Sequence, residues 1–367
     1  MTPSSERTLP PSAKILIVLM GSIGDVVRAL PLLGRIRRGL PQAHIAWVIE
    51  PKSLPMVAGH RWLDEVIVYD RAAPWTFPNL LLRIRAARFD LVLDLQRHLK
   101  SGVISLASGA LERIGFNRAN TKEFNHCFNR SSIPAQPPLR LKLLQYQAFG
   151  DALGLPGAPI EFGLEPTFEE SNRASELLGD APRPLLGVIL GSSWPSRLYF
   201  PDSIAEVIRI LATPGEGTRA MVPVLLGAPE DRGLAREVSA RLAAQRAIDL
   251  CGRTTLRELA AVLTQCAAAF GPDCGPMHIA AAVGCPIVSL WGSTAPERSA
   301  PWGFGEFALR GQIPCHPCYL RECPIGRECM RRIEPAEVAA AVRRAVGSAM
   351  TAAARRPGAS IADPGLA

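Results

Sequence analysis

The sequence of 367 residues contains no stretch of 18 or more consecutive apolar residues, although 48% of its residues are hydrophobic. A membrane-spanning helix needs about 20 such residues, so none is predicted. The apolar run at residues 15–20 is also shorter than the hydrophobic segment of a secretory signal peptide, which takes about 7 to 15 residues. We therefore expect a cytoplasmic protein that touches a membrane at most from its surface.

Two classes of sequence motif are also absent. The chain has no zinc-finger spacing and no basic tract interleaved with aromatic residues, so we expect no nucleic-acid partner. The Gly-rich segment GSIGDVV at residues 21–27 lacks the G-x-G-x-x-G spacing of a dinucleotide fingerprint. The nine cysteines of a chain expected in the cytoplasm predict thiols or metal ligands in place of a disulfide framework.

The net charge of +8 is unevenly distributed along the chain. Residues 1–165 hold 20 Lys and Arg against 13 Asp and Glu, whereas residues 166–367 hold 21 against 20. A basic first half indicates an anionic partner on one side only, such as a phosphorylated substrate or an acidic membrane surface. A generally basic, solvated face is the alternative interpretation.

Short apolar runs alternate with helical patterns along both halves of the chain, which is typical of parallel sheets built from β-α-β units. The segment 153–166 between the halves is dense in Pro and Gly and suits a linker. We therefore predict an α/β protein with two doubly wound, Rossmann-like domains at residues 1–165 and 166–346. Residues 347–367 are predicted to be a disordered tail. The runs lie at residues 15–20, 44–50, 66–69, 91–95, 185–190, 221–227, 267–271 and 286–292.

The segment FGPDCGPMHIAAAVGCPIVSLWG at residues 270–292 gives the strongest local signal. It predicts a strand, a tight loop with Asp273, Cys274 and Gly275, and a helix begun by the following proline. Such a loop aims free backbone N–H groups and the positive end of a helix dipole at a ligand, and a diphosphate suits that position. Asp273 would either contact the ligand or cap the helix. His278 would either reach the ligand or pack in the core.

Two further strand exits carry polar residues. In GSSWPSRLYFP (191–201), small hydroxyl residues can bond phosphate oxygens, and Arg197 offers a permanently charged fork unless it is simply solvated. In LLGAPED (225–231), Glu230 is placed to accept hydrogen bonds from ribose hydroxyls, and Asp231 competes for that role.

Asp25 lies in the loop GSIGDVV, which follows the apolar run at residues 15–20. Loops at the carboxyl ends of parallel strands bind the ligands of open α/β folds, so Asp25 is a candidate for chemistry. A helix N-cap is the alternative interpretation.

Four cysteines lie within 15 residues near the C-terminal end, in a C-x2-C-x4-C-x5-C pattern. Four thiolates can surround Zn²⁺ tetrahedrally, although this spacing matches no standard pair of zinc-binding knuckles. A structural zinc ion, reduced thiols and a labile disulfide therefore all stay open. The four residues are Cys315, Cys318, Cys323 and Cys329.

Seven motifs in this order resemble the bacterial heptosyltransferases of glycosyltransferase family 9, and the resemblance covers roughly residues 14–346. The resemblance implies a GT-B fold, in which two domains face each other across a cleft. It also implies an ADP-heptose donor bound mainly by the second domain and a lipopolysaccharide inner-core acceptor bound by the first. The motifs are GSIGDVVRALPLL, DLQRHLKSG, RIGFNR, GSSWPSRLYFP, LLGAPED, GPDCGPMHIAAAVGCPIVSLWGSTAPERSAPWG and CHPCYLRECPIGRECMRRI.

The resemblance assigns roles to particular residues. The proposed general base of the family falls on Asp25, and its donor loop falls on the Asp273 loop, where Cys274 replaces the usual hydroxyl residue. Arg197 stands where the family usually has lysine. The predicted donor-binding residues are Ser192, Ser193, Arg197, Glu230, Thr254, Asp273, Cys274, Gly275 and His278. The predicted acceptor-binding residues are Ser22, Gly24, Arg97, Lys100, Arg118 and Arg140.

The chemistry of glycosyl transfer agrees with these roles. Transfer with inversion needs a base on the acceptor hydroxyl, which contributes typically about 10² to 10⁴ in rate, and Asp25 can supply it. Arg197 and the helix N-terminus can stabilise the departing diphosphate. The sequence has no D-x-D motif, so we expect neither a metal bridge nor another cofactor in catalysis.

We therefore predict an inverting, metal-independent glycosyltransferase that moves heptose from ADP-heptose to the inner core of lipopolysaccharide. Its expected partners are the nucleotide sugar, a lipid A–core precursor and the anionic inner face of the inner membrane. One alternative keeps the fold with another nucleotide sugar or acceptor. The other is a scaffold that binds a nucleotide sugar without transferring it.

Overall fold

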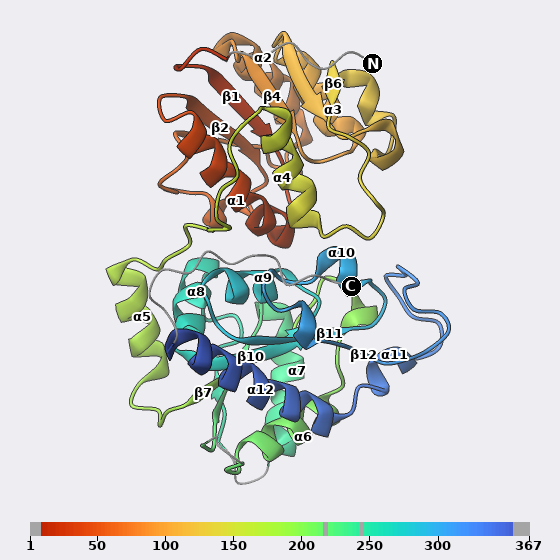
Figure 1. Ribbon diagram of the computed structural model, residues 1–367. Coiled ribbons are helices and arrows are strands. Elements are labelled where there is room, and N and C mark those ends of the chain that lie inside the picture. The colour runs from red at the N-terminus through yellow and green to blue at the C-terminus, as the bar shows by residue number, and fades with distance from the viewer. Residues whose placement is uncertain (1–8, 216–218, 243–245, 355–367) are drawn as a thin grey trace. The chain divides into compact units, whose positions relative to one another are not determined.

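The computed structural model of the protein describes residues 9–215, 219–242 and 246–354 (Figure 1). The chain divides into two compact units, Met1–Gly163 and Leu164–Ala367. Each unit contains one six-stranded sheet in which every pair of neighbouring strands is parallel. The predicted pair of doubly wound, Rossmann-like units is therefore confirmed, and the cleft between them stays a prediction.

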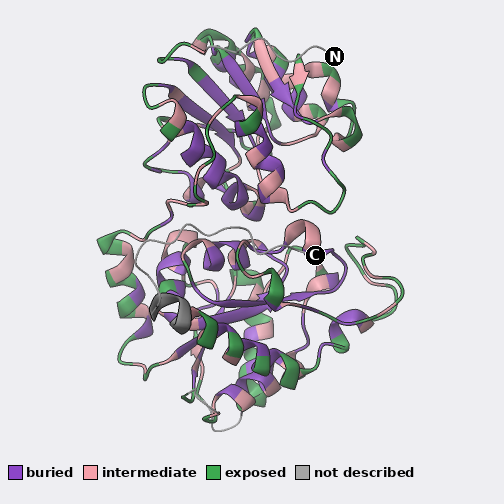
Figure 2. Cartoon of the chain, in the orientation of Figure 1, coloured by how far each residue is buried: buried purple, intermediate pink, exposed green. Residues whose placement is uncertain are grey.

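In unit 1 the strand order is β3-β2-β1-β4-β5-β6. The first strand, KILIV, is almost wholly apolar, as expected for a strand covered by helices on both faces (Figure 2). Helices α2 and α3 pack side by side over one face, and α1 and α4 pack together. The elements are β1 (Lys14–Val18), α1 (Ile23–Gly39), β2 (His44–Ile49), β3 (Glu65–Val68), α2 (Phe77–Ala87), β4 (Leu91–Asp94), α3 (Leu99–Ala107), β5 (Glu112–Gly115), β6 (Ser131–Ser132) and α4 (Lys142–Ala152).

In unit 2 the strand order is β12-β11-β10-β7-β8-β9. Helices α6 and α12 pack together and bury apolar residues against the strands β7, β10 and β11. The elements are α5 (Phe168–Leu178), β7 (Leu185–Ile189), α6 (Pro201–Leu211), β8 (Val222–Leu226), α7 (Arg232–Arg241), β9 (Ile248–Asp249), α8 (Leu256–Thr264), β10 (Cys266–Pro272), α9 (Gly275–Ala282), β11 (Ile287–Trp291), α10 (Pro296–Ser299), β12 (Ala308–Arg310), α11 (Glu328–Arg331) and α12 (Pro335–Ala354).

All eight apolar runs of the sequence lie on strands, but four strands were not predicted. These four, β5, β6, β9 and β12, are short, and none of them has the β-branched, apolar composition of a buried strand, because each is polar or contains a charged residue. The units divide two residues before the predicted boundary at 165/166. The prediction of a tail from residue 347 is wrong as far as Ala354, because α12 continues through this alanine-rich segment. Residues 355–367 lie outside the described part of the chain.

Parallel pairing fixes where the loops lie. The carboxyl ends of neighbouring parallel strands meet at one edge of the sheet, so the loops after β1, β4 and β5 share one edge of unit 1. The loops after β10, β7, β8 and β9 share one edge of unit 2 in the same way. Among the described helices, none is both long enough and apolar enough to cross a membrane.

Gly34→Ala should destabilise unit 1. Gly34 lies in α1 against the buried ring of Trp62, and a Cβ added there would lie 2.6 Å from Cζ3 of that ring. We expect the free energy of unfolding, measured by urea denaturation, to fall by about 1–3 kcal/mol. The matched control is Gly233→Ala in α7, where an added Cβ meets nothing within 4 Å. Alanine should stabilise that helix by about 0.5–1 kcal/mol, and equal stability of the two variants would contradict the packing argument.

Candidate functional site

Asp25 lies in the first turn of α1, where four side chains bind its carboxylate. Its Oδ1 accepts hydrogen bonds from Arg28 Nη2 at 2.7 Å, Lys142 Nζ at 2.8 Å and Tyr146 Oη at 3.1 Å. Ser22 is the N-cap residue of α1, and its hydroxyl donates to Oδ2 of Asp25 at 3.3 Å. The alternative interpretation of Asp25 as the N-cap is therefore wrong.

The electrostatics of this cluster keep Asp25 ionised. Burial raises the pKa of the Asp25 carboxyl, but the charges of Lys142 and Arg28 outweigh burial and hold the pKa well below its usual value. The carboxylate side chain is 17% exposed, so it remains within reach of solvent or a ligand. Burial and the negative charge of Asp25 raise the pKa of Tyr146, which keeps its phenol protonated as a donor.

Three partners of Asp25 were missed by the sequence analysis. Arg28 follows Asp25 by three residues on the same helix, a spacing that brings side chains together, so it was detectable. Lys142 and Tyr146 lie one turn apart on α4, and they follow Asp25 by 117 and 121 residues. Only the packing of α4 against α1 brings them to the carboxylate.

The predicted acceptor-binding residues are only partly brought together. Gly24 is buried in the same turn as Asp25. Arg97 donates to Gln145 Oε1 on α4 and stacks 3.8 Å from the centroid of Phe116, so α4 connects it to the Asp25 cluster. The other three make no side-chain contact with Asp25 among the described residues: Lys100 donates to Tyr69 Oη at 3.1 Å, Arg140 donates to Gln136 Oε1 at 2.8 Å, and Arg118 is exposed.

In unit 2, Asp273 lies between β10 and α9 and is bound by residues from two other strand exits. Its Oδ2 accepts from Thr294 Oγ1 at 2.7 Å and lies 3.2 Å from Nη1 of Arg197. Its backbone carbonyl accepts from Ser192 Oγ at 2.9 Å. Cys274, and not Asp273, is the N-cap residue of α9, so the capping alternative for Asp273 is wrong. Thr294 was missed by the sequence analysis.

Arg197 combines an ion pair with an unused donor. Its guanidinium lies 4.1 Å from the centroid of Trp194, and its buried Nε has no hydrogen-bond partner among the residues that the structure describes. A buried N–H of a cation usually has an acceptor, so this group indicates where an anion would bind. Burial raises the pKa of the nearby Cys274 thiol to about 12, which keeps that thiol neutral.

The remaining predicted donor residues lie on the same sheet edge without forming one contact set. Glu230 and Ser193 are exposed, and Thr254 lies just before the N-cap residue of α8. Asp231, the competitor of Glu230, accepts from the backbone N–H of Ala228 at 2.8 Å. In α9, Gly275 is the first residue and His278 is buried, 4% exposed.

The four predicted metal-binding cysteines line one narrow cavity of about 10 Å³, together with Ser196 and His316. All four are free thiols. Burial raises the pKa of Cys329, and the nearby Cys323, Cys315 and Cys318 raise it further. As they stand, however, no three His, Cys, Asp or Glu side chains in the described part of the chain are arranged to hold a metal ion.

The cysteine segment is bonded to the loop that carries Arg197. Ser196 donates its hydroxyl to the carbonyl of Leu320 at 2.6 Å and its N–H to that of Arg321 at 3.1 Å. The N–H of Tyr319 donates to Ser293, in the loop after β11, at 2.7 Å. The segment therefore holds two strand-exit loops of unit 2 in place.

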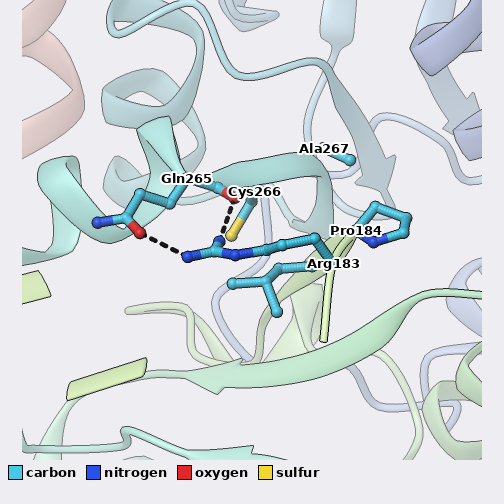
Figure 3. Close-up of a pocket in the computed structure, with 6 residues that line it drawn as sticks. Arg183, Pro184, Gln265, Cys266 and Ala267 are labelled. Carbon is cyan, nitrogen blue, oxygen red and sulfur yellow. Dashed lines mark hydrogen bonds between the residues drawn. The ribbon is translucent and has the colours of Figure 1, made fainter. Parts of the chain in front are cut away.

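A shallow hollow of about 420 Å³ lies at the edge of the unit 2 sheet that is opposite to the loops that carry Arg197 and Asp273 (Figure 3). It is lined by the first residues of β7 and β10, Leu185 and Cys266. Arg183 occupies part of it and donates to the carbonyl and to Oε1 of Gln265 at 2.8 and 2.7 Å. Because it lies at the amino ends of the strands, it is not part of the candidate site.

Known proteins resemble this chain over most of its length. Residues 79–328 match the model of glycosyltransferase family 9 (heptosyltransferase). Lipopolysaccharide heptosyltransferase 1 of Pseudomonas aeruginosa is 27% identical over 84% of this chain and 87% of its own.

Solved structures share the fold. A family 9 glycosyltransferase from Veillonella parvula has a TM-score of 0.75 at 20% identity and covers 92% of this chain and 97% of its own. The E. coli heptosyltransferase WaaC, solved with ADP, has a TM-score of 0.70 at 18% identity. The match covers 90% of this chain and 99% of the WaaC chain.

Proposed function

The chain belongs to glycosyltransferase family 9, the heptosyltransferases, and from that premise we propose that it transfers heptose from ADP-heptose to the inner core of lipopolysaccharide. The observation that carries the proposal is the strand exit of unit 2, where Arg197 pairs with Asp273 in the loop that begins α9 and its Nε has no hydrogen-bond partner among the described residues. A helix N-terminus and a buried guanidinium together suit a diphosphate. The ADP bound by WaaC supports an ADP-linked donor.

Asp25 is the proposed general base. In the transfer step, the acceptor hydroxyl oxygen forms a bond to the anomeric carbon of the sugar while the bond from that carbon to the diphosphate oxygen breaks. The hydroxyl proton passes to Asp25, and ADP leaves with the electron pair of the broken bond. Arg197 and the N–H groups at the start of α9 stabilise the charge that develops on the diphosphate. None of these roles needs a catalytic metal.

The low pKa of Asp25 limits its strength as a base, because a general base works best when its pKa lies near the working pH. We propose that binding of the acceptor raises the pKa of Asp25 toward the working pH. Its acidic sugar or phosphate groups would draw Lys142 from Asp25, and the pKa of Asp25 would then rise in the complex. Arg97, which α4 connects to this cluster, is a second candidate for the same anionic groups.

A structural metal at the four cysteines is a further proposal. A set of four thiolates suits zinc or iron, and the cavity that they line has the volume of about one water molecule. The thiols would have to rotate to surround the ion, since no three of them are so arranged now in the described chain. Through Ser196, the metal would stiffen the loop that carries Arg197.

Two variants separate the two halves of the proposed reaction. Asp25→Asn should lower kcat for heptose transfer by about 10²-fold or more and leave ADP binding unchanged. Arg197→Met should weaken ADP binding, measured as a smaller rise of Tm on addition of ADP. Transfer to a lipopolysaccharide-core acceptor is followed with ADP-heptose as donor.

The nucleotide control uses UDP. If UDP raises the Tm of the wild-type protein more than ADP does, the assignment of the donor is wrong. If Asp25→Asn transfers heptose at the parent rate, Asp25 is not the base. If no heptose is transferred while ADP is bound, a binding scaffold replaces the enzyme.

Lys142→Met should change the pH dependence of kcat/KM. The substitution removes a cation that lowers the pKa of Asp25, so that pKa rises. A base must be deprotonated to act, so the acid limb of kcat/KM moves to higher pH by about one unit or more. Lys52→Met, at an exposed residue of the same unit, is the control and should leave the profile unchanged. Overlapping profiles for Lys142→Met and the parent protein would refute the proposed coupling.

The metal proposal predicts about one equivalent of zinc or iron per chain of purified protein in elemental analysis. Cys323→Ser and Cys329→Ser should lose the metal and show a smaller ADP-induced rise of Tm. Cys127→Ser, at an exposed cysteine of unit 1, should keep the metal and the full ADP-induced rise of Tm. Metal-free wild-type protein with an unchanged response to ADP would rule out the metal.

A further inference from the structure

The loop that precedes Asp25 lies between a strand ladder and a helix. Strands β1 and β4 are neighbours in the sheet of unit 1 (Figure 1), and at the end of their ladder the N–H of Leu95 donates to the carbonyl of Val18 at 3.0 Å. Helix α1 begins at Ile23. Residues 19–21 belong to neither element, and Met20 is only 5% exposed. Their buried backbone groups therefore need hydrogen-bond partners from another segment.

The side chain of Gln96, in the loop after β4, supplies two of these partners. Its Oε1 accepts from the N–H of Met20 at 2.8 Å, and its Nε2 donates to the carbonyl of Gly21 at 3.1 Å. The next residue, Ser22, is the N-cap residue of α1, and Asp25 lies in the first turn of that helix. The amide therefore fixes the segment that sets where α1 begins.

This contact needs an amide, and its backbone is itself fixed. A carboxamide presents a donor and an acceptor at the same time, whereas a carboxylate only accepts. The backbone N–H of Gln96 donates to Oδ1 of the fully buried Asp94 at 3.2 Å, and Oδ2 of Asp94 accepts from Asn125 at 2.6 Å. Because its backbone is held in this way, the Gln96 side chain reaches the loop before α1 from a fixed point.

The residue that follows Gln96 binds the other helix of the Asp25 cluster. Arg97 has a φ of 74°, in the left-handed region that residues other than glycine rarely adopt and that is common at functional sites. Its guanidinium donates to Gln145 on α4, the helix that brings Lys142 to Asp25. Two consecutive residues of one loop thus contact both elements whose packing forms the cluster.

We propose that Gln96 is a positioning residue for the general base Asp25. It holds the loop before α1 and thereby sets where the carboxylate lies relative to the acceptor hydroxyl. A misplacement of about 1 Å at such a group can lower the rate by about 10²-fold. Both ends of the amide bind backbone, so Gln96 acts through Asp25 and not on the substrate. The inference rests on the proposed function, because it takes Asp25 as the base.

Asp90 offers a matched contact at the other end of the same two strands. It lies just before β4, and its Oδ2 accepts from the N–H of Lys14, the first residue of β1, at 2.8 Å. The amino ends of parallel strands lie at the edge opposite to the ligand-binding loops. Asp90→Ala therefore weakens the attachment of β1 to the β4 segment without touching the loop before Asp25.

The first test is steady-state kinetics of heptose transfer. Gln96→Met removes both hydrogen bonds and should lower kcat by about tenfold or more. The KM for ADP-heptose and the ADP-induced rise of Tm should stay unchanged, because the proposed donor site lies in unit 2. Gln96→Asn keeps the amide but is one methylene shorter, so it should also lose kcat, and it carries the test if Gln96→Met does not fold. Asp90→Ala should lower Tm and keep the parent kcat.

The second test follows the ionisation of Asp25 without any transfer. If the loop moves, Asp25 leaves the cations beside it, and its pKa rises. Carbon NMR of protein labelled at the aspartate Cγ, with the signal assigned through Asp25→Asn, should show Asp25 titrating at higher pH in Gln96→Met than in the wild type. The groups that face this carboxylate are Ser22 and Arg28 from the start of α1, and Lys142 and Tyr146 from α4.

Two kinetic results would overturn the positioning role: the parent kcat in both Gln96 variants, or an equal loss of kcat in Asp90→Ala, which would assign the effect to the stability of the sheet. Failure of the proposed function looks different. If the wild-type protein transfers no heptose, the enzyme is refuted, yet a higher titration of Asp25 in Gln96→Met still supports the positioning of its carboxylate. An unchanged titration refutes the positioning as well.

Discussion

Parallel pairing of buried strands is the constraint on which the rest of this structure depends. Each sheet has six strands and every ladder within it is parallel, so each connection must cross the sheet. All loops that follow strands then meet at one edge, whatever their distance along the sequence. Residues from the loops after β7, β10 and β11 contact one another in unit 2 for this reason alone.

The pKa of a buried carboxyl group in this protein depends on whether a cation lies beside it. Asp25 is held by Arg28 and Lys142, and its pKa is lowered well below its usual value. Asp94, at the end of β4, accepts hydrogen bonds from the amides of Asn125 and Asn129, and burial raises its pKa. Both residues lie at the same sheet edge. The cations beside Asp25 keep its carboxylate ionised, so that its charge can act on a ligand, whereas Asp94 accepts hydrogen bonds from the segment that carries Asn125 and Asn129.

The cysteine segment shows how a structural element supports a binding loop. Its backbone accepts both hydrogen bonds that Ser196 donates, one residue before Arg197. The Arg197 side chain in turn stacks on Trp194 and pairs with Asp273. A planar cation held by these two residues loses little further entropy when an anion binds, which is the physical basis of preorganisation.

The sequence by itself determined the two doubly wound units, since apolar runs buried on both faces are readable as strands, and it determined the family through seven ordered motifs. It also placed Asp25, Arg197 and Asp273 at strand exits, because a loop after a buried strand is a local pattern. Only the tertiary structure decided which partners these residues have: Lys142 and Tyr146 reach Asp25 by helix packing across more than a hundred residues, and Thr294 reaches Asp273 across a sheet edge. Local patterns fix the period and ends of an element, but contacts between distant segments depend on the packing of the whole unit.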